Sequence, residues 1–216
     1  MLDTAFLITA FATLFVVIDP PGLIPLFIAL TPGMDPDHRR RVALRACLVA
    51  GAILTAFGLL GEAVLGFIGI SMPAFRIAGG MLLFLTALDM LFERRTQRRE
   101  GQTQAEHPDD PSVFPLALPL IAGPGAIATM ILLVGQARGD WGKIAAVHLV
   151  MAATLAAAFA MMMIAGPVGR LLGRTGTVVI TRILGMLLAA LSVQFVIDGI
   201  IGIGLDNGLI LLGRGK

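Results

Sequence analysis

The sequence predicts an all-α integral membrane protein with six transmembrane helices, and three observations support this fold class. Of the 216 residues, 57% are hydrophobic and 14% are charged, whereas an average soluble domain has about half apolar and about a quarter charged residues. The mean hydropathy of the whole chain is +0.91. The apolar residues also gather into six runs, most of them close to the roughly 20 residues that cross a bilayer as a helix.

The positions of the expected helices and loops follow from these runs. The spans cover about residues 5–30, 42–68, 75–92, 113–136, 143–164 and 183–212. Stretches rich in polar, basic, glycine or proline residues, at 31–41, 71–73, 93–112, 137–142 and 166–181, are expected to be the loops and turns between them. We expect one membrane domain over residues 1–216, made of a first three-helix repeat at 1–95, a cytoplasmic loop at 96–112 and a second three-helix repeat at 113–216.

The first and the fourth span each carry proline and glycine in the middle of the apolar run. Residues 19–25 read DPPGLIP, and residues 122–128 read AGPGAIA. Because proline removes a backbone donor and glycine weakens a helix, we expect the first helix to break at 19–25 and the fourth at 123–125. A broken helix in a bilayer is tolerated where its backbone is buried in protein or lines a cavity. Two breaks in matching positions of two halves therefore indicate the binding site of a transporter.

The two breaks belong to a weak internal repeat. Pro21-Gly22 matches Pro124-Gly125, and at nearly the same spacing Arg76-Ile77-Ala78-Gly79 matches Arg182-Ile183-Leu184-Gly185. Each half contains three spans, so the second half must cross the membrane with the opposite polarity. The sequence thus predicts a 3+3 inverted-topology repeat in which the two Pro-Gly motifs face each other near the middle of the membrane.

Broken helices offer two kinds of binding group. A half-helix that begins at a break presents unpaired amides and the positive end of its dipole, which can hold a carboxylate. A half-helix that ends there presents carbonyls, which suit an ammonium group or a cation. An amino acid carries both charges, although the prolines could instead only kink helices that pack against lipid. The residues that we expect to bind substrate are Asp19, Pro21, Gly22, Leu23, Gly123, Pro124, Gly125, Ala126 and Thr129.

Three acidic residues within predicted spans are candidates for ion coupling, because a carboxylate at membrane depth is costly and usually functional. Asp19 directly precedes the first break, where it could cap the next half-helix, accept a proton or bind a substrate ammonium. Glu62 in the second span could carry a proton or lie in water near the outer interface. Asp198, one turn after Gln194 in the sixth span, could line the cavity or bond a neighbouring helix. Thr129, one turn after Gly125, could donate to substrate or to a carbonyl of its own helix.

The distribution of basic residues predicts an orientation. The chain has 16 Lys and Arg residues, and placing the N-terminus outside puts most of them in loops on the inner side, as the positive-inside rule requires. The inner residues would be Arg39, Arg40, Arg41, Arg45, Arg94, Arg95, Arg98, Arg99, Arg170, Arg174 and Arg182, and the outer ones Arg76, Arg138, Lys143, Arg214 and Lys216. We therefore expect a multi-pass membrane protein with both termini on the outer side.

The signals of an enzyme are missing from the sequence. It has no His and Cys at metal-ligand spacing, no phosphate-binding loop and no suggestive Ser, His and Asp pattern. We therefore expect no catalytic activity, no metal and no cofactor, apart from a coupling proton or sodium ion. The formal charge of +2 does not indicate nucleic acid. The expected partners are a small-molecule substrate and the lipid bilayer, and the oligomeric state is left open.

The sequences around the two breaks, IDPPGLIPLF at 18–27 and FPLALPLIAGPGAIAT at 114–129, resemble those of the MarC family of six-span bacterial membrane proteins, also described as a neutral amino acid transporter family. The length, the six spans and the basic central loop agree, so the resemblance covers nearly the whole chain. It implies ion-coupled uptake or exchange of small neutral amino acids such as glycine and alanine. It also implies a multi-pass protein of the bacterial cytoplasmic (inner) membrane, in which the orientation expected above places both termini in the periplasm. One departure is Leu23, where many relatives carry Asn, a change that could shrink or dry the pocket.

Together, the breaks, the repeat and the resemblance predict a secondary transporter of small neutral amino acids, of the glycine and alanine class. Its substrate would bind between the two broken helices and move by alternating access. One alternative is an exporter of another small metabolite or a drug. The other is a non-transporting membrane scaffold.

Overall fold

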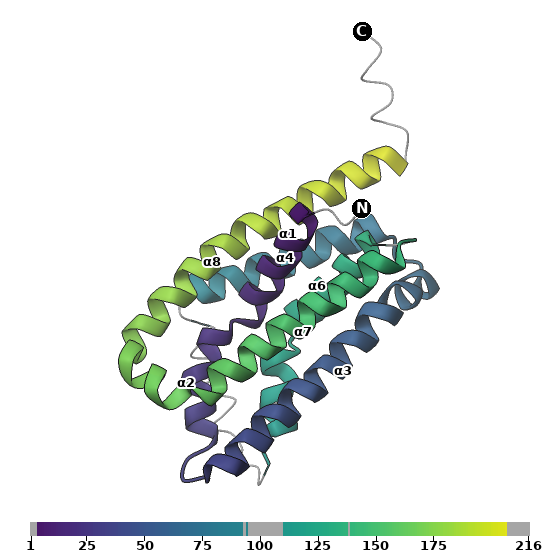
Figure 1. Cartoon of the computed structure of the whole chain (residues 1–216). Helices are drawn as coiled ribbons and strands as arrows, with labels where there is room; N and C mark the ends of the chain where they lie inside the picture. Colours follow the sequence, from purple (N-terminus) through teal and green to yellow (C-terminus); the bar gives the residue numbers. More distant parts are fainter. Residues whose placement is uncertain (1–3, 93, 95–109, 138, 207–216) are drawn as a thin grey trace.

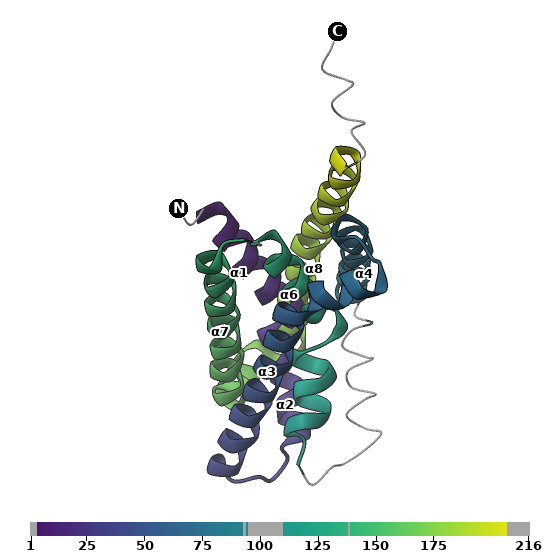
Figure 2. The same ribbon diagram turned by 90° about the vertical axis from the view of Figure 1, so that its right-hand side faces the viewer.

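The computed structural model describes residues 4–92, 94, 110–137 and 139–206, and its regular elements are all helical. They are α1 (Thr4–Ile18), α2 (Pro20–Leu30), α3 (Pro36–Ile68), α4 (Met72–Leu91), η1 (Ser112–Ile121), α6 (Pro124–Gln136), α7 (Trp141–Met163) and α8 (Ala165–Asp206). The helices form an elongated bundle, in which the start of α1 and the end of α8 lie toward the same end (Figures 1 and 2).

The helices confirm the membrane class that the sequence predicted. Five spans are long and apolar enough to cross a bilayer, and η1 with α6 makes a sixth if that bent pair is counted as one. The outer faces of these spans are apolar, with exposed side chains such as Leu48, Leu85, Leu149 and Ile200. Large exposed apolar surfaces are rare on soluble proteins, so this surface faces lipid.

The first span is the centre of the bundle. Within its most apolar window, 72% of the residues are buried inside the protein, compared with 22–33% for the other four long spans. Its two halves, α1 and α2, pack against α6, α7 and α8. The first break is therefore enclosed by other helices and does not face lipid.

Helix caps explain why several helices begin earlier than expected. The Asp35 side chain accepts a hydrogen bond of 2.9 Å from the His38 amide, and Pro36 occupies the first helical position. The same amide bond is the main cause that lowers the pKa of Asp35. As a result α3 starts at Pro36, and the loop predicted at 31–41 was too long. Ser71 caps α4 in the same way by accepting from the Ala74 amide.

The loop predicted at 166–181 is wrong, because α8 runs through it from Ala165 to Asp206. Its glycines and arginines suggested a connection, but the regular helix is interrupted only at Gly173, whose φ of 58° and ψ of −174° are non-helical. Glycine adopts this conformation without the steric cost that a side chain would add. Figure 1 shows the first turns of α8 folding away from its long remainder.

α4 and α8 pack against each other along their length with very close backbones (Figures 1 and 2). A Cβ on Gly80 of α4 would lie 2.8 Å from the Ser192 carbonyl oxygen of α8, and a Cβ on Gly199 of α8 would lie 2.9 Å from the Pro73 carbonyl oxygen of α4. Small residues let membrane helices approach this closely. Because Pro73 meets Gly199 and Gly80 meets Ser192, the two helices are antiparallel. An inverted repeat requires this of its two third spans, but the repeat itself stays a prediction.

Some predictions fall outside the described residues. These are residues 93 and 95–109 of the predicted loop, the end of the sixth span at 207–212, and the basic residues Arg95, Arg98, Arg99, Arg138, Arg214 and Lys216. The division into two three-helix repeats likewise stays a prediction.

The close packing of α4 on α8 can be tested by adding one methyl group. Gly80→Ala would press a Cβ against backbone atoms that cannot rotate away, so we expect it to destabilise the protein by about 1–3 kcal/mol. Gly66→Ala is the matched control, because a Cβ on Gly66 meets no atom within 4 Å, and it should be neutral or stabilise by about 0.5–1 kcal/mol. The measurement is the thermal unfolding midpoint in detergent. Equal midpoints for the two variants would contradict the packing.

Candidate functional site

The first break is confined to a single residue, Asp19. Its backbone is left-handed, with φ of 58° and ψ of 62°, and no other non-glycine residue in the described part of the chain has positive φ. Aspartate tolerates this conformation better than most residues. The sequence predicted a break over 19–25, but Pro20 and Pro21 occupy the first turn of α2, where a missing amide is not needed. Gly22, Leu23 and Pro25 are all helical.

The prolines leave carbonyl groups of α1 without their usual helical donors. In a continuous helix the Val16 carbonyl would accept from residue 20, but Pro20 has no amide hydrogen. The Ile18 carbonyl would accept from the Gly22 amide, which instead donates to Asp19 Oδ1 at 3.2 Å. The last turn of α1 therefore presents backbone oxygens at the break.

The Asp19 carboxylate is buried deep in the protein, with 1% of the residue exposed. One of its oxygens caps α2 through the Gly22 amide and also lies 3.5 Å from Thr181 Oγ1 of α8, which donates a long hydrogen bond. Hydrogen bonds of this kind reduce the cost of burying a carboxylate. Sequence reasoning missed Thr181 because it lay at the end of a predicted loop. Nothing in its sequence context pointed to the first span.

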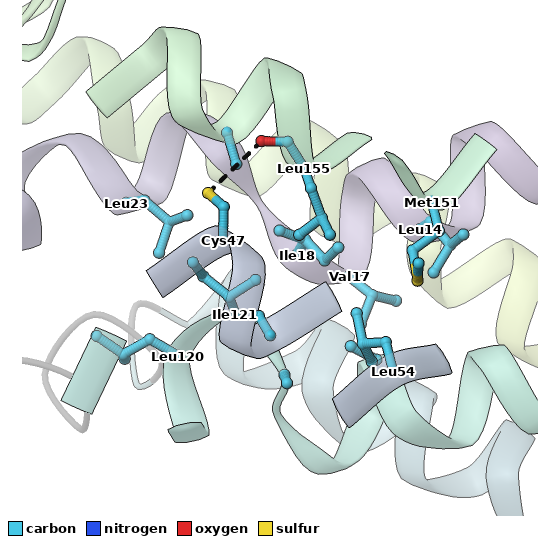
Figure 3. Close-up of a cluster of buried hydrophobic side chains, with 14 of the residues drawn as sticks. Leu14, Val17, Ile18, Leu23, Cys47, Leu54, Leu120, Ile121, Met151 and Leu155 are labelled. Atoms are coloured by element: carbon cyan, nitrogen blue, oxygen red, sulfur yellow. Dashed lines mark hydrogen bonds between the residues drawn. The ribbon is translucent and has the colours of Figure 1, made fainter. Parts of the chain in front are cut away.

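Apolar side chains surround the first break (Figure 3). Leu14, Val17 and Ile18 precede Asp19, and Leu23 follows it. Residues of α3, η1 and α7 complete the cluster, among them Cys47, Leu54, Leu120, Ile121, Met151 and Leu155. Charges at Asp19 therefore act in surroundings of low dielectric, where their interactions are strong. Leu23 is fully buried in this core.

The second break is broader than the sequence predicted. The axes of η1 and α6 differ by 59°, and the irregular backbone extends back to Phe114 and Leu118, which have extended conformations. Each of them precedes a proline, Pro115 or Pro119, and a residue before proline disfavours helical angles. The expected interruption at 123–125 is therefore only the end of a longer distorted segment.

The start of α6 has a different cap from the start of α2. Gly123 is the N-cap residue and Pro124 takes the first helical position, but no side chain caps the helix. The first four amides of a helix have no partner within it, and Pro124 has no amide hydrogen. The amides of Gly125 and Ala126 therefore point toward the break with no side-chain acceptor, and both residues are buried.

The start of α6, at the second break, packs against the end of α1, which directly precedes the first break. A Cβ on Gly125 would lie 3.2 Å from Val17 Cγ1, 3.4 Å from Leu83 Cδ2 and 3.6 Å from Thr86 Oγ1. Gly22 is covered by the Asp19 carboxylate itself. The nearest neighbours of Gly125 thus come from α1 and α4, and the predicted facing of the two Pro-Gly motifs across a site stays a prediction. The amide end of α6 meets the carbonyl end of α1, two residues before Asp19.

Thr129 also belongs to the second break. It donates a 2.8 Å hydrogen bond to the Gly125 carbonyl and is completely buried. Of the two roles considered, this structure contains the bond to its own helix.

Glu62 and Asp198 lie away from both breaks. Glu62 lines a groove of about 480 Å³ at the end of α3, together with Gly66, Ile70 and Met72. The preceding residue, Gly61, packs on Ile131, which is about 9 Å along α6 from Gly125. Asp198 accepts a 2.8 Å hydrogen bond from Gln194, one turn earlier in α8. Among the residues that the structure describes, no three His, Cys, Asp or Glu side chains form a group that could hold a metal.

Known proteins resemble the chain over nearly its whole length. A family model described as MarC family integral membrane protein matches residues 4–204. The chain is 39% identical over 200 residues to a UPF0056 membrane protein of Archaeoglobus fulgidus, covering 91% of this chain and 92% of the relative. It is 35% identical over 212 residues to the UPF0056 membrane protein YvbG of Bacillus subtilis, covering 94% and 95%.

A third relative has a name that states its membrane. The UPF0056 inner membrane protein YhgN of Escherichia coli K12 is 33% identical over 196 residues, which cover 90% of this chain and 95% of YhgN. No solved structure matches the chain significantly. The family match includes both breaks and extends from the start of α1 almost to the end of α8. The chain therefore belongs to the MarC family of integral membrane proteins, as the sequences around its two breaks predicted.

Proposed function

We propose that the protein is a secondary transporter of small neutral amino acids, of the glycine and alanine class. The substrate binds where the amide end of α6 meets the carbonyl end of α1. The observation that carries this proposal is the difference in capping between the two breaks. Asp19 caps α2, whereas no side chain caps α6. One break therefore supplies donors for an anion, and the other supplies acceptors for a cation.

The substrate carboxylate belongs at the start of α6. The amides of Gly125 and Ala126, together with the helix dipole, favour a negative group there. The amide of Gly22, which the sequence had suggested as a second donor, already donates to Asp19. Pro21, Leu23, Gly123 and Pro124 shape the two breaks and need not contact the substrate through polar atoms.

The substrate ammonium belongs at the end of α1. The carbonyl oxygens of Val16 and Ile18 and the carboxylate of Asp19 are acceptors that suit a positive group in an apolar setting. Amino and carboxylate groups of one amino acid are only a few bonds apart, which fits two helix ends in contact. Val17, Leu83 and Thr86 crowd Gly125, so a side chain as small as that of glycine or alanine is favoured.

Asp19 is the best of the three candidates for ion coupling. It is the acidic residue at the first break, whereas Glu62 and Asp198 lie near the end of the bundle that contains the turn between α3 and α4. A proton on Asp19, or a sodium ion held by its carboxylate and the α1 carbonyls, would link substrate binding to an ion gradient. No further cofactor, metal or catalytic step is part of the proposal.

Transport requires a change of conformation. Asp19, Ala126 and Thr129 are buried, so a substrate can reach these residues only after the helices move. The bend between η1 and α6 and the non-helical Gly173 of α8 are places where the helices are already interrupted. Motion at such interruptions would open the site alternately to the two sides.

We also propose in which membrane the protein lies and on which side its termini are. The relative YhgN is named an inner membrane protein, which supports a place in the cytoplasmic membrane for this chain. The basic start of α3, with Arg39, Arg40, Arg41 and Arg45, favours an inner position for that end of the bundle. Both termini would then lie in the periplasm, since α1 starts and α8 ends at the opposite end (Figure 1). Export of another metabolite or drug, and a scaffold role without transport, are the competing functions.

The substrate class is tested by counterflow in proteoliposomes. Vesicles loaded with unlabelled glycine or alanine should take up the labelled amino acid well above empty vesicles, because exchange needs only the binding site and its two open states. A panel of larger amino acids and drugs serves as the comparison. Exchange of a drug without exchange of glycine or alanine would favour the exporter and overturn the substrate class.

A variant at the second break separates transport from a scaffold role. Gly125→Leu should abolish counterflow, because its side chain would occupy the space beside Val17, Leu83 and Thr86. Gly66→Leu is the control, since nothing lies within 4 Å of a Cβ at that position. A scaffold predicts that both variants function equally when they fold, as judged by yield and gel filtration.

Asp19→Asn distinguishes a coupling role from simple capping. Asparagine caps a helix as well as aspartate and tolerates positive φ, so the loss of stability should be less than about 1 kcal/mol. We expect gradient-driven accumulation to fall to the level of empty vesicles, while counterflow continues with a weaker substrate affinity because the ammonium loses a charged acceptor. If Asp19→Asn still accumulates substrate against a gradient, Asp19 is only a cap. Uptake by the wild type after collapse of both proton and sodium gradients would exclude ion coupling altogether.

The orientation is tested with reporter fusions. Alkaline phosphatase fused after residue 206 should be active, because it folds outside the cytoplasm, and a cytoplasmic fluorescent reporter at the same place should be dark. Fusions within 96–109 should give the opposite result. A bright C-terminal fluorescent fusion would overturn the predicted orientation.

A further inference from the structure

A groove of about 360 Å³ lies on the outer face of α3 near its start. Three of its lining side chains are basic or can become so, namely His38, Arg41 and Arg45. Leu44 and Leu48 form its apolar part, and Asp110 from the segment before η1 also lines it. The groove lies at the basic end of the bundle, and it belongs to neither break.

The basic and the apolar side chains of the groove follow one another along the same face of α3. Arg41, Leu44, Arg45 and Leu48 are spaced at three and four residues, so they share one face of α3. Leu44 is 47% exposed and Leu48 is 64% exposed. From Arg41 to Leu48 the helix rises about 10 Å. A ligand that fits this face must have a charged end and an apolar end about that far apart.

The length of α3 places the charged part at the membrane interface. A helix of 33 residues is about 50 Å long, whereas the hydrocarbon core is about 30 Å thick. The first turns of α3 therefore extend beyond the hydrocarbon into the headgroup region, while Leu48 reaches back toward the acyl chains. Arg41 and Arg45 are then at the depth of lipid phosphates.

The charge of the groove favours an anion. Arg45 forms an ion pair with Asp110, and the two side chains are 61% and 42% exposed. Asp110 also accepts a 3.0 Å hydrogen bond from the Ser112 amide, so each of its two carboxylate oxygens has a partner. Arg41 lies outside that ion pair. Of the acidic residues near it outside the groove, Asp35 caps α3 through the His38 amide, and Asp37 is exposed and does not line the groove. With His38 neutral, the lining side chains keep a formal charge of +1.

The neighbouring arginines Arg39 and Arg40 do not line the groove. Arg39 lies over the ring of Phe27, with its guanidinium carbon 5.2 Å from the ring centre, and this cation–π contact directs it toward α2. Arg40 is exposed and does not line the groove. Arg41 is therefore the side chain on which anion binding depends most.

We propose that this groove is a binding site for an anionic phospholipid with one net negative charge. Its phosphate contacts Arg41 and Arg45, with His38 beside them, and its acyl chain lies along Leu44 and Leu48. Basic pockets on the cytoplasmic side of membrane proteins bind anionic headgroups in this way. The site is independent of the proposed transport function. Because Arg45 also holds Asp110, a bound lipid would stabilise the start of the fourth span.

Native mass spectrometry of the full-length protein tests the proposal. The protein, purified in a mild detergent, is mixed with equal amounts of dioleoyl phosphatidylglycerol, phosphatidylethanolamine and phosphatidylcholine. We expect the wild type to retain phosphatidylglycerol preferentially. Arg41→Gln should lower that retention about fivefold, the effect of one basic side chain at an anionic surface. Arg40→Gln, which removes the same charge next to the groove, should leave it unchanged.

The result is read only for variants that elute as a single species. Arg41→Lys keeps the charge and should retain most of the phosphatidylglycerol, even if Arg41→Gln fails to fold. Equal retention of the three lipids by the wild type would overturn the proposal without any variant. So would equal losses in Arg41→Gln and Arg40→Gln, or displacement of the lipid by an equal concentration of soluble glycerol phosphate.

Discussion

The structure depends on one constraint, which is that backbone amides and carbonyls within a bilayer must find partners inside the protein. Pro20 and Pro21 remove two amides from the middle of the first span, so the carbonyls of α1 lose helical donors there. Asp19 adapts to this loss by turning into a left-handed conformation and accepting the Gly22 amide with its side chain. Such a residue cannot face lipid, and the other helices accordingly surround the first span.

The surrounding helices approach the break from both sides. α6 approaches from the second half of the chain with an uncapped amide end, and α8 contributes the hydroxyl of Thr181. Close contact between α4 and α8, made possible by Gly80 and Gly199, brings α8 into place beside the first span. The polar atoms of the centre are thereby enclosed in an apolar shell, where a few hydrogen bonds discriminate strongly between ligands.

The two breaks differ in what they can bind, although their sequences look alike. The first has a carboxylate and backbone oxygens, and the second has amides and no ionisable side chain. This asymmetry suits a zwitterion better than either a simple anion or a simple cation. It also supports the proposal that Asp19 carries the coupling charge, since Glu62 and Asp198 lie toward the end of the bundle.

The sequence by itself determined the membrane class, the family and the position of both interruptions, because hydrophobic length and proline chemistry are local properties. It also identified Asp19 as the residue before the first break. Tertiary structure decided the rest. Whether Gly22 or Val17 meets Gly125, and whether Thr181 reaches Asp19, depends on how helices more than 100 residues apart in sequence pack. The helix through 166–181 was likewise hidden, because its glycines and arginines favour a loop locally, whereas in the fold this segment continues directly into the part of α8 that packs on the first span and on α4.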